Sequence, residues 1–204
     1  MLNINVILMG SNFVGRKSIM KRFIDEKFSK EFTTQYYVGF LEKKIEILNQ
    51  KINFNLKTIY ERGCRAILTK FVGKNSNVVL LVYDITSKDS FLEIKDYYYE
   101  EAKNQSNNEI IFVIVGNKSD LNEKREVEKT EGEEYAKKIG AIFYETSAKT
   151  NDNISELFND LAKIFITRNN FNSKINENIN KDEKKISLSL NKFSNENKKK
   201  KICK

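Results

Sequence analysis

Three polar residues that could bind a purine base follow a strongly apolar run of the chain. The run Ile110–Val115 (IIFVIV) precedes a loop that contains Asn117, Lys118 and Asp120. An aspartate carboxylate can accept both N–H groups on one edge of guanine, and a site built on such bonds rejects analogues that lack them. Asn117 can bind the other edge of the purine and brace the loops, while the stem of Lys118 can cover one face of the ring. These residues predict recognition of guanine.

A second loop supplies candidate contacts to the same base. It follows the apolar run Ala141–Tyr144 (AIFY) and contains Ser147, Ala148 and Lys149. We expect the backbone N–H of Ala148 to meet the guanine carbonyl, and we place Ser147 and Lys149 in the same guanine-binding loop. Ligands on parallel α/β sheets bind at the carboxyl ends of the strands, where both loops would lie.

A glycine-rich segment near the start of the chain could hold phosphate groups. Phosphate loops join a strand to a helix through a glycine, four further residues and a Gly-Lys-Ser/Thr sequence. Their backbone N–H groups cradle the phosphates, the Lys reaches the β and γ oxygens, and the hydroxyl holds Mg²⁺. After the run Asn3–Met9 the spacing is present, and the candidate phosphate-binding residues are Gly10, Val14, Gly15, Arg16, Lys17 and Ser18.

Two substitutions alter the chemistry of this loop. Arg16 stands where a lysine is expected, and Lys17 stands where a serine or threonine is expected. Ser18 lies one residue after the position expected for the hydroxyl, which places it about 100° further around a helix. Arginine and lysine are not interchangeable in a tight phosphate pocket. Two interpretations remain open: the loop still binds phosphate, or it has drifted after losing that use.

The elements that must position these loops alternate along the chain, a pattern typical of a mostly parallel α/β sheet. Near-continuous apolar runs predict buried strands over Asn3–Met9, Val78–Asp84, Ile110–Val115 and Ala141–Tyr144. Alternation over Lys44–Leu48 and Ile52–Leu56 predicts a hairpin around Asn49-Gln50. Helical spacing predicts helices over Arg16–Phe23, Ser90–Lys103, Glu131–Ile139 and Asn153–Ile166. The second of these would turn Phe91, Ile94, Tyr98 and Ala102 inward, and Gly140 would close the third.

The Asn-Lys-x-Asp and Ser-Ala-Lys motifs, each after its strand, resemble the guanine motifs of the Ras superfamily. Leu81–Thr86 (LVYDIT) followed by Ser90-Phe91 is similar to the Rab branch in particular. The similarity covers roughly residues 3 to 166. It implies a P-loop NTPase-like, three-layer α/β domain with a mostly parallel six-stranded sheet and helices on both faces. It further implies GTP or GDP as the ligand, with Phe28 as the aromatic residue that stacks on the base.

The resemblance also shows which catalytic groups this chain lacks. Gln35 takes the place of the first-switch Thr that closes over Mg²⁺ in Rab proteins, although Thr34 is adjacent. In the second switch, the Asp that holds Mg²⁺ is replaced by Thr58, or by Lys57 if one gap is allowed. The Gln that orients water is replaced by Arg62 or is missing. Phosphoryl transfer depends on that metal and that water. We therefore assign no catalytic or metal-binding residue, expect little or no GTP hydrolysis, and place Mg²⁺ binding in doubt.

Composition separates a near-neutral domain from a basic tail. Of the net charge of +8, residues 168–204 carry +7, from eleven Lys or Arg against four Asp or Glu. We divide the chain into a small GTPase domain over 1–167 and a disordered basic tail over 168–204. Lys198–Lys201 precedes Cys203, which fits neither a C-a-a-X box nor a double-cysteine ending. This tail is either a lipid anchor at Cys203 with a polybasic patch for an anionic membrane, or a solvated charge run.

These features favour one function over two others. No histidine is present, which excludes histidine catalysis and ligation. Since no signal peptide or membrane span is recognisable, we expect a cytoplasmic monomer, peripheral on the cytosolic face of an endomembrane. The leading hypothesis is a Rab-like guanine-nucleotide switch in vesicle traffic, whose partners are trafficking effectors and Rab regulators. The alternative is a nucleotide-free pseudoGTPase scaffold, which the intact base motifs disfavour. Nucleic-acid binding through the tail is disfavoured because aromatic and basic residues do not interleave there.

Overall fold

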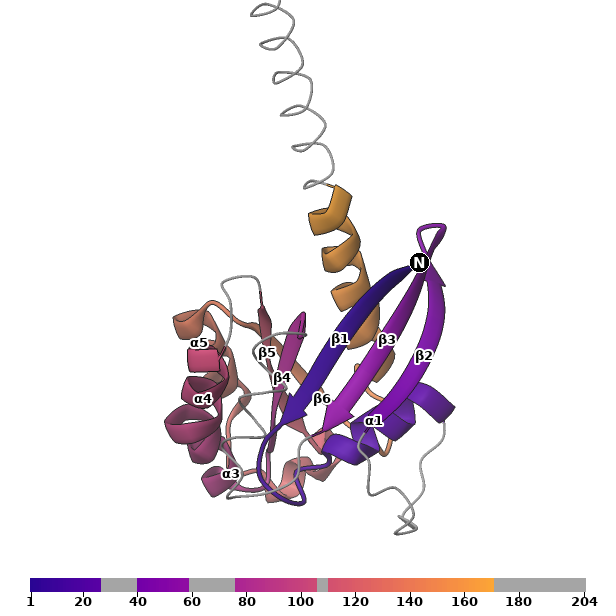
Figure 1. Cartoon of the computed structure of the whole chain (residues 1–204). Coiled ribbons are helices and arrows are strands. Elements are labelled where there is room, and N and C mark those ends of the chain that lie inside the picture. The colour runs from indigo at the N-terminus through magenta and orange to yellow at the C-terminus, as the bar shows by residue number, and fades with distance from the viewer. Residues whose placement is uncertain (27–39, 59–75, 106–109, 171–204) are drawn as a thin grey trace, which may run out of the picture. The chain divides into compact units, whose positions relative to one another are not determined.

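A six-stranded sheet forms the centre of the fold (Figure 1). The computed structural model describes residues 1–26, 40–58, 76–105 and 110–170. The strand order is β2-β3-β1-β4-β5-β6, with β2 antiparallel to β3 and every other neighbouring pair parallel. The strands are β1 Leu2–Met9, β2 Phe40–Ile47, β3 Gln50–Thr58, β4 Val78–Asp84, β5 Ile111–Asn117 and β6 Ile142–Thr146. The predicted fold class is confirmed.

Helices cover both faces of the sheet (Figure 1). They are α1 Arg16–Asp25, α3 Lys88–Glu93, η1 Ile94–Tyr98, α4 Tyr99–Gln105, the short 3₁₀ helix η2 Ser119–Lys124, and α5 Lys129–Ile139. A last helix covers residues 154–170. Contacts divide the chain into two compact units, Met1–Ala162 and Lys163–Lys204, and the sheet belongs entirely to the first. Among the described residues, no helix is both long enough and apolar enough to cross a membrane.

An aromatic cluster packs α1 and the last helix onto one face of the sheet. Phe23 of α1 stacks on Phe158, with ring centroids 3.8 Å apart. Both rings meet Phe54 of β3 edge-on, at 5.4 Å and 5.6 Å. Burying a phenylalanine stabilises a fold by about 1.5–3 kcal/mol. Since Phe23 lies near the end of α1, this cluster fixes the helix that begins at the candidate phosphate loop.

The opposite face carries the larger apolar core. Strand β4 is buried at all seven positions, as its uninterrupted apolar sequence predicts for a strand covered on both sides. Alternate residues of β1 and β4 face α3, η1, α4 and α5 in a cluster that includes Ile7, Met9, Leu81, Tyr83, Phe91, Ile94, Tyr99 and Ala136. The central strands therefore form a rigid base for the loops at their carboxyl ends.

A π-helical turn corrects one sequence-based expectation. The single helix predicted over Ser90–Lys103 is divided into α3, η1 and α4, and the backbone N–H of Tyr99 bonds to the carbonyl of Ile94, five residues earlier. This wider turn advances the inward face by one residue. Tyr99 is therefore buried, whereas Tyr98, which α-helical spacing turned inward, is only partly covered.

The predicted hairpin is confirmed, with its turn one residue earlier than expected. Ile47 pairs with Gln50, so Leu48 and Asn49 form a two-residue loop. Both have positive φ, 51° and 59°. Two-residue hairpin turns of this kind need positive φ at both positions to match the twist of the strands. Asparagine tolerates that conformation well, and Leu48, 68% exposed, adopts it without packing against the core.

Candidate functional site

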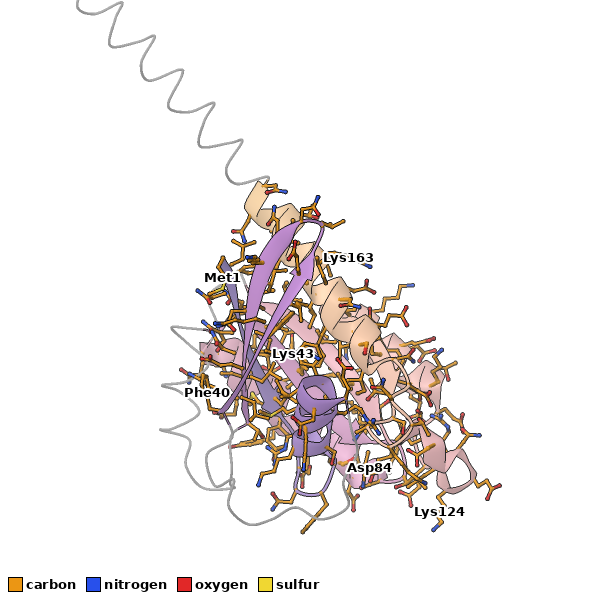
Figure 2. All side chains as sticks on the ribbon, turned by 90° about the vertical axis from the view of Figure 1, so that its right-hand side faces the viewer. Met1, Phe40, Lys43, Asp84, Lys124 and Lys163 are labelled. Carbon is orange, nitrogen blue, oxygen red and sulfur yellow. The ribbon has the colours of Figure 1, made fainter. Side chains whose placement is uncertain are left out.

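Loops from four strands meet at one end of the sheet. Strands β1, β4, β5 and β6 run in the same direction, so the loops that follow them leave the sheet at the same edge. Figure 2 shows Asp84, the last residue of β4, at the end away from Met1. A cavity of about 250 Å³ opens there, lined by Phe13, Gly15, Ser18, Asn117, Lys118, Asp120, Leu121, Ala148 and Lys149. Seven of the residues proposed from sequence thus share one cavity.

Asn117 ties three of these loops together. It is 1% exposed, and its side-chain Nδ2 donates to the carbonyl of Val14 at 2.8 Å. Its Oδ1 accepts from the hydroxyl of Thr146 at 3.2 Å. The bracing role expected of Asn117 is therefore visible, because one amide joins the loops after β1, β5 and β6. Contact of Asn117 with a purine edge stays a prediction.

Asp120 presents a carboxylate to the cavity. Its Oδ1 accepts from the hydroxyl of Ser147 at 2.6 Å, and the ammonium of Lys149 lies 3.4 Å from Oδ2. A carboxylate has about four lone-pair directions, so these partners leave acceptors for the two N–H groups of a guanine edge. Ser147 is fully buried, and its own oxygen also accepts from the backbone N–H of Thr150 at 3.1 Å. The carboxylate is therefore held in a fixed orientation.

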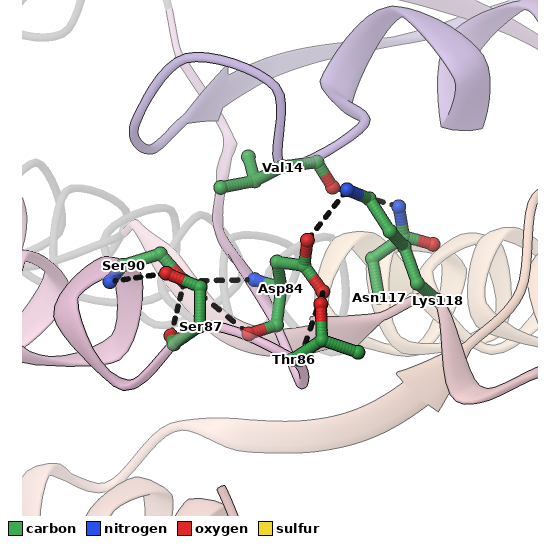
Figure 3. Close-up of polar contacts among 7 residues, drawn as sticks. All are labelled: Val14, Asp84, Thr86, Ser87, Ser90, Asn117 and Lys118. Atoms are coloured by element: carbon green, nitrogen blue, oxygen red, sulfur yellow. Dashed lines mark hydrogen bonds and ion pairs between the residues drawn. The ribbon is translucent and has the colours of Figure 1, made fainter. Parts of the chain in front are cut away.

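Lys118 extends along the cavity wall to a carboxylate on the neighbouring strand (Figure 3). Its ammonium lies 2.5 Å from Oδ2 of Asp84, while Oδ1 of Asp84 accepts from the backbone N–H and the hydroxyl of Thr86 at 2.9 Å and 2.8 Å. The backbone of Lys118 is left-handed, with φ of 68°. This anchoring stretches the stem of Lys118 beside the cavity, the placement that would cover one face of a base.

Arg22 of α1 donates hydrogen bonds to the backbone of the second base loop. Its Nε donates to the carbonyl of Ala148 and its Nη2 to the carbonyl of Lys149, both at 2.7 Å. Hydrogen bonds from a charged donor are roughly twice as strong as neutral ones. With the carbonyls of Ala148 and Lys149 engaged by α1, this loop keeps its position at the cavity.

An ion pair fixes the strand end that leads into the same loop. Two guanidinium nitrogens of Arg125 donate to the two carboxylate oxygens of Glu145, at 2.6 Å and 3.1 Å. The hydrogen bond to Glu145 raises the pKa of Arg125 above its ordinary value. Such bidentate pairs add geometric specificity. Glu145 is thereby fixed two residues before Ser147, which orients Asp120.

The candidate phosphate loop requires glycine at both ends. Gly10 has φ of 142°, and a Cβ there would lie 2.0 Å from the carbonyl oxygen of Val82. Gly15 has φ of 97°, and its Cβ would lie 2.2 Å from Nδ2 of Asn117. Val14 between them is buried. The loop is therefore pressed against β4 and β5, a close approach of backbone that only glycine permits.

The first turn of α1 carries the substituted residues. α1 begins at Arg16, which is 9% exposed, and its first turn contains no acidic residue. The N-terminus of a helix of this length favours anions through its backbone N–H groups and its dipole. Ser18, predicted from the sequence to turn away from the metal position, lines the cavity together with Gly15. Lys17 follows Arg16 on the same turn.

Several predicted residues lie outside the described part of the chain. These are Phe28, Thr34, Gln35, Arg62 and Cys203. Both candidates for the second-switch aspartate position are described: Lys57 and Thr58 end β3, beside Ile7 and Leu8 of β1. Among the described residues, no group of three or more acidic or cysteine side chains is arranged to hold a metal ion.

Several residues of the site were not predicted from the sequence, among them Asp84, Thr146 and Arg22. Asp84 could have been predicted from the sequence, because it ends a buried parallel strand and ligands bind at the carboxyl ends of such strands. Thr146 and Arg22 act through partners 29 and 126 residues away. Nothing in their local sequence identifies those partners.

Comparison with known proteins agrees with this geometry. Residues 5–167 match the Ras family. The human Ras-related protein Rab-21 is 38% identical over 161 residues, which cover 79% of this chain and 71% of the relative. Rab-21 of Dictyostelium discoideum is 37% identical over 161 residues, 79% of this chain and 76% of the relative. SEC4 of Saccharomyces cerevisiae is 34% identical over 160 residues, 78% of this chain and 73% of the relative. With the base motifs at one cavity of a Ras-like sheet, the chain belongs to the Rab family of small GTPases, which bind guanine nucleotides.

Proposed function

We propose that this protein is a guanine-nucleotide-binding Rab-like switch in vesicle-mediated membrane traffic, with GTP hydrolysis impaired or lost. The observation that carries the proposal is the Asp120 carboxylate, oriented by Ser147 at 2.6 Å in the wall of a cavity shared with Asn117 and Lys118. Its partners would be trafficking effectors and Rab regulators, chosen by the state of the nucleotide.

Nucleotide extraction tests the proposal. The protein is purified without added nucleotide and denatured, and the released small molecules are separated by chromatography. We expect GDP or GTP in near-stoichiometric amount and no adenine nucleotide. If the protein carries none and guanine nucleotides added up to millimolar concentration do not bind, the proposed function is wrong.

The residues that replace the metal ligands do not fit Mg²⁺. An ammonium at Lys17 stands where the family has a hydroxyl, and β3 ends in Lys57 and Thr58, neither of which is a carboxylate. Mg²⁺ requires oxygen ligands, usually one or two carboxylates with substrate phosphates. We propose that Arg16, with its planar fork, and Lys17, as a compact charge, hold the phosphates without the ion.

GTP turnover is expected to be negligible. Ordinary small GTPases of this family hydrolyse GTP unaided at only on the order of 10⁻⁴ per second. Loss of the Gln and of the Mg²⁺ supports removes the group that orients the attacking water and the ion that neutralises the developing charge. Single-turnover assays with radiolabelled GTP and Mg²⁺ should therefore match the buffer blank. A rate equal to that of ordinary relatives would show that the stretch Lys57–Gly63 is wrongly aligned with the family motif.

One observation favours a nucleotide-free scaffold as a second candidate. Protein contacts brace the base loops: Asn117 donates to Val14, Ser147 to Asp120, and Arg22 to Ala148. The same contacts would hold these loops in place as a binding surface for another protein. Absence of guanine-nucleotide binding in the extraction test, with the fold intact, would support this candidate.

Membrane attachment through the tail is a separate prediction. Lys198–Lys201 lies beside Cys203, and each lysine near an anionic leaflet contributes about 1 kcal/mol to binding. Cys203→Ser should move a tagged protein from the membrane fraction to the cytosol. Cys64→Ser, which changes the other cysteine of the chain, is the matched control and should fractionate like the wild type. If Cys203→Ser also fractionates like the wild type, the lipid anchor is refuted.

A further inference from the structure

Phe13 is a bulky aromatic residue exposed within the candidate phosphate loop. It is 92% exposed, the highest value among the exposed large hydrophobic residues of the described chain. Its backbone is left-handed, with φ of 65°. Positive φ is unusual for a bulky residue and is strained. Exposure of the ring to water is unfavourable as well. Burial in the core offsets neither cost, because the residue is almost fully exposed.

Phe13 lines two neighbouring cavities. On one side lies the 250 Å³ cavity lined by Asp120, Lys118 and Gly15. On the other side lies a second cavity of about 390 Å³, lined by polar groups that include Ser11, Asp84 and Glu93. The Lys118–Asp84 ion pair joins the walls of the two cavities. Phe13 therefore contributes both to the cavity of the base loops and to a cavity whose wall includes the phosphate loop.

We propose that the ring of Phe13 packs on the sugar of a bound guanine nucleotide and retards its release. This inference rests on the proposed function. Asp120 fixes where the base edge lies, and the loop between Gly10 and Gly15 fixes where the phosphates lie. The sugar joins the base to the phosphates. It therefore passes residues that belong to the phosphate loop and also line the base cavity. Phe13 belongs to the phosphate loop and also lines the base cavity.

The chemistry of this contact determines what it can affect. A phenyl ring offers apolar contact to the C–H groups of a sugar and has no hydrogen-bonding group with which to read a base. Phe13 therefore contributes to residence time and leaves the choice of guanine to Asp120. The contact also covers apolar surface that is otherwise exposed to water.

The first test measures release of a fluorescent GDP. Phe13→Ala should accelerate release about tenfold, the change expected from losing part of the burial of an aromatic ring. The preference for guanine over adenine nucleotides should not change. The matched control is Leu48→Ala, since Leu48 is also exposed at 68% with positive φ, 51°, and lies in the β2–β3 turn. Release from Leu48→Ala should equal that from the wild type.

A second test reports placement. The chain contains no tryptophan, so Phe13→Trp introduces its only indole. Energy transfer from that indole to a fluorophore on the sugar of GDP should be stronger than in Leu48→Trp. If Phe13→Ala releases GDP at the wild-type rate, or if transfer from position 13 does not exceed that from position 48, the inference is overturned and the proposed function stands. If the wild type binds no guanine nucleotide, both are overturned.

Discussion

Asp120→Asn is expected to change the base preference of the site from guanine to xanthine. The carboxylate of Asp120 offers two acceptors to the two N–H groups of guanine, whereas an asparagine amide offers one acceptor and one donor. Xanthine carries a carbonyl where guanine carries its amino group, so it matches the amide. The affinity ratio of GDP to XDP should fall by on the order of 10⁴, the discrimination typical of a site built to hydrogen-bond one group.

Competition against a fluorescent GDP measures this ratio. The fold should survive, because the Oδ1 of asparagine can still accept from Ser147, which donates to Asp120 at 2.6 Å. Asp89→Asn is the matched control: it removes the same charge from an exposed residue of α3 and should leave the ratio unchanged. Equal competition by ADP and GDP in the wild-type protein would contradict the assignment of Asn117, Lys118 and Asp120 to guanine.

Chelation of divalent cations is expected to leave nucleotide release unchanged. Ordinary relatives release nucleotide quickly when Mg²⁺ is removed. Here the ammonium of Lys17 takes the place of the hydroxyl that would hold the ion, and β3 ends without a carboxylate. The release rate of a fluorescent GDP should therefore be the same with Mg²⁺ and with EDTA. A large acceleration by EDTA would show that the ion is retained.

Variants of α1 separate a phosphate contact from a general charge effect. A hydrogen bond to a charged group contributes about 1.5–3 kcal/mol, so Lys17→Ala should weaken GDP binding about 10- to 150-fold. Lys21→Ala removes the same charge one helical turn later on α1 and should change affinity little. Equal effects of the two substitutions would show that Lys17 acts only through net charge.

The central strands were the most predictable elements. The boundaries of β4 agree with the predicted run Val78–Asp84. A strand buried on both faces has a nearly continuous apolar sequence, which makes its ends easy to locate. Gly140 ends α5 with φ of 70°, as a glycine after a helical stretch predicts. The position of the base loops was predictable as well. A motif that follows a parallel strand lies at the edge of the sheet where ligands bind.

Where sequence reasoning failed, the deciding interaction was not local. The π-turn that buries Tyr99 in place of Tyr98 inserts one residue into a helix whose apolar pattern fits α-helical spacing equally well. The sequence predicts a role only for the stem of Lys118, and Asp84, the partner of its ammonium, lies 34 residues away. Phe13 combines high exposure with a left-handed backbone, and nothing in its residue type predicts either property.

Helix α1 connects the two halves of the nucleotide site mechanically. Its first turn follows Gly15 of the phosphate loop, and Arg22, near its end, holds the carbonyls of Ala148 and Lys149. The ten residues of α1 span about 15 Å as one stiff rod. If the phosphates and the base are bound as proposed, a partner protein that tilts this helix would loosen both contacts in a single motion. Nucleotide exchange would then need no separate opening at the phosphate loop and at the base loops.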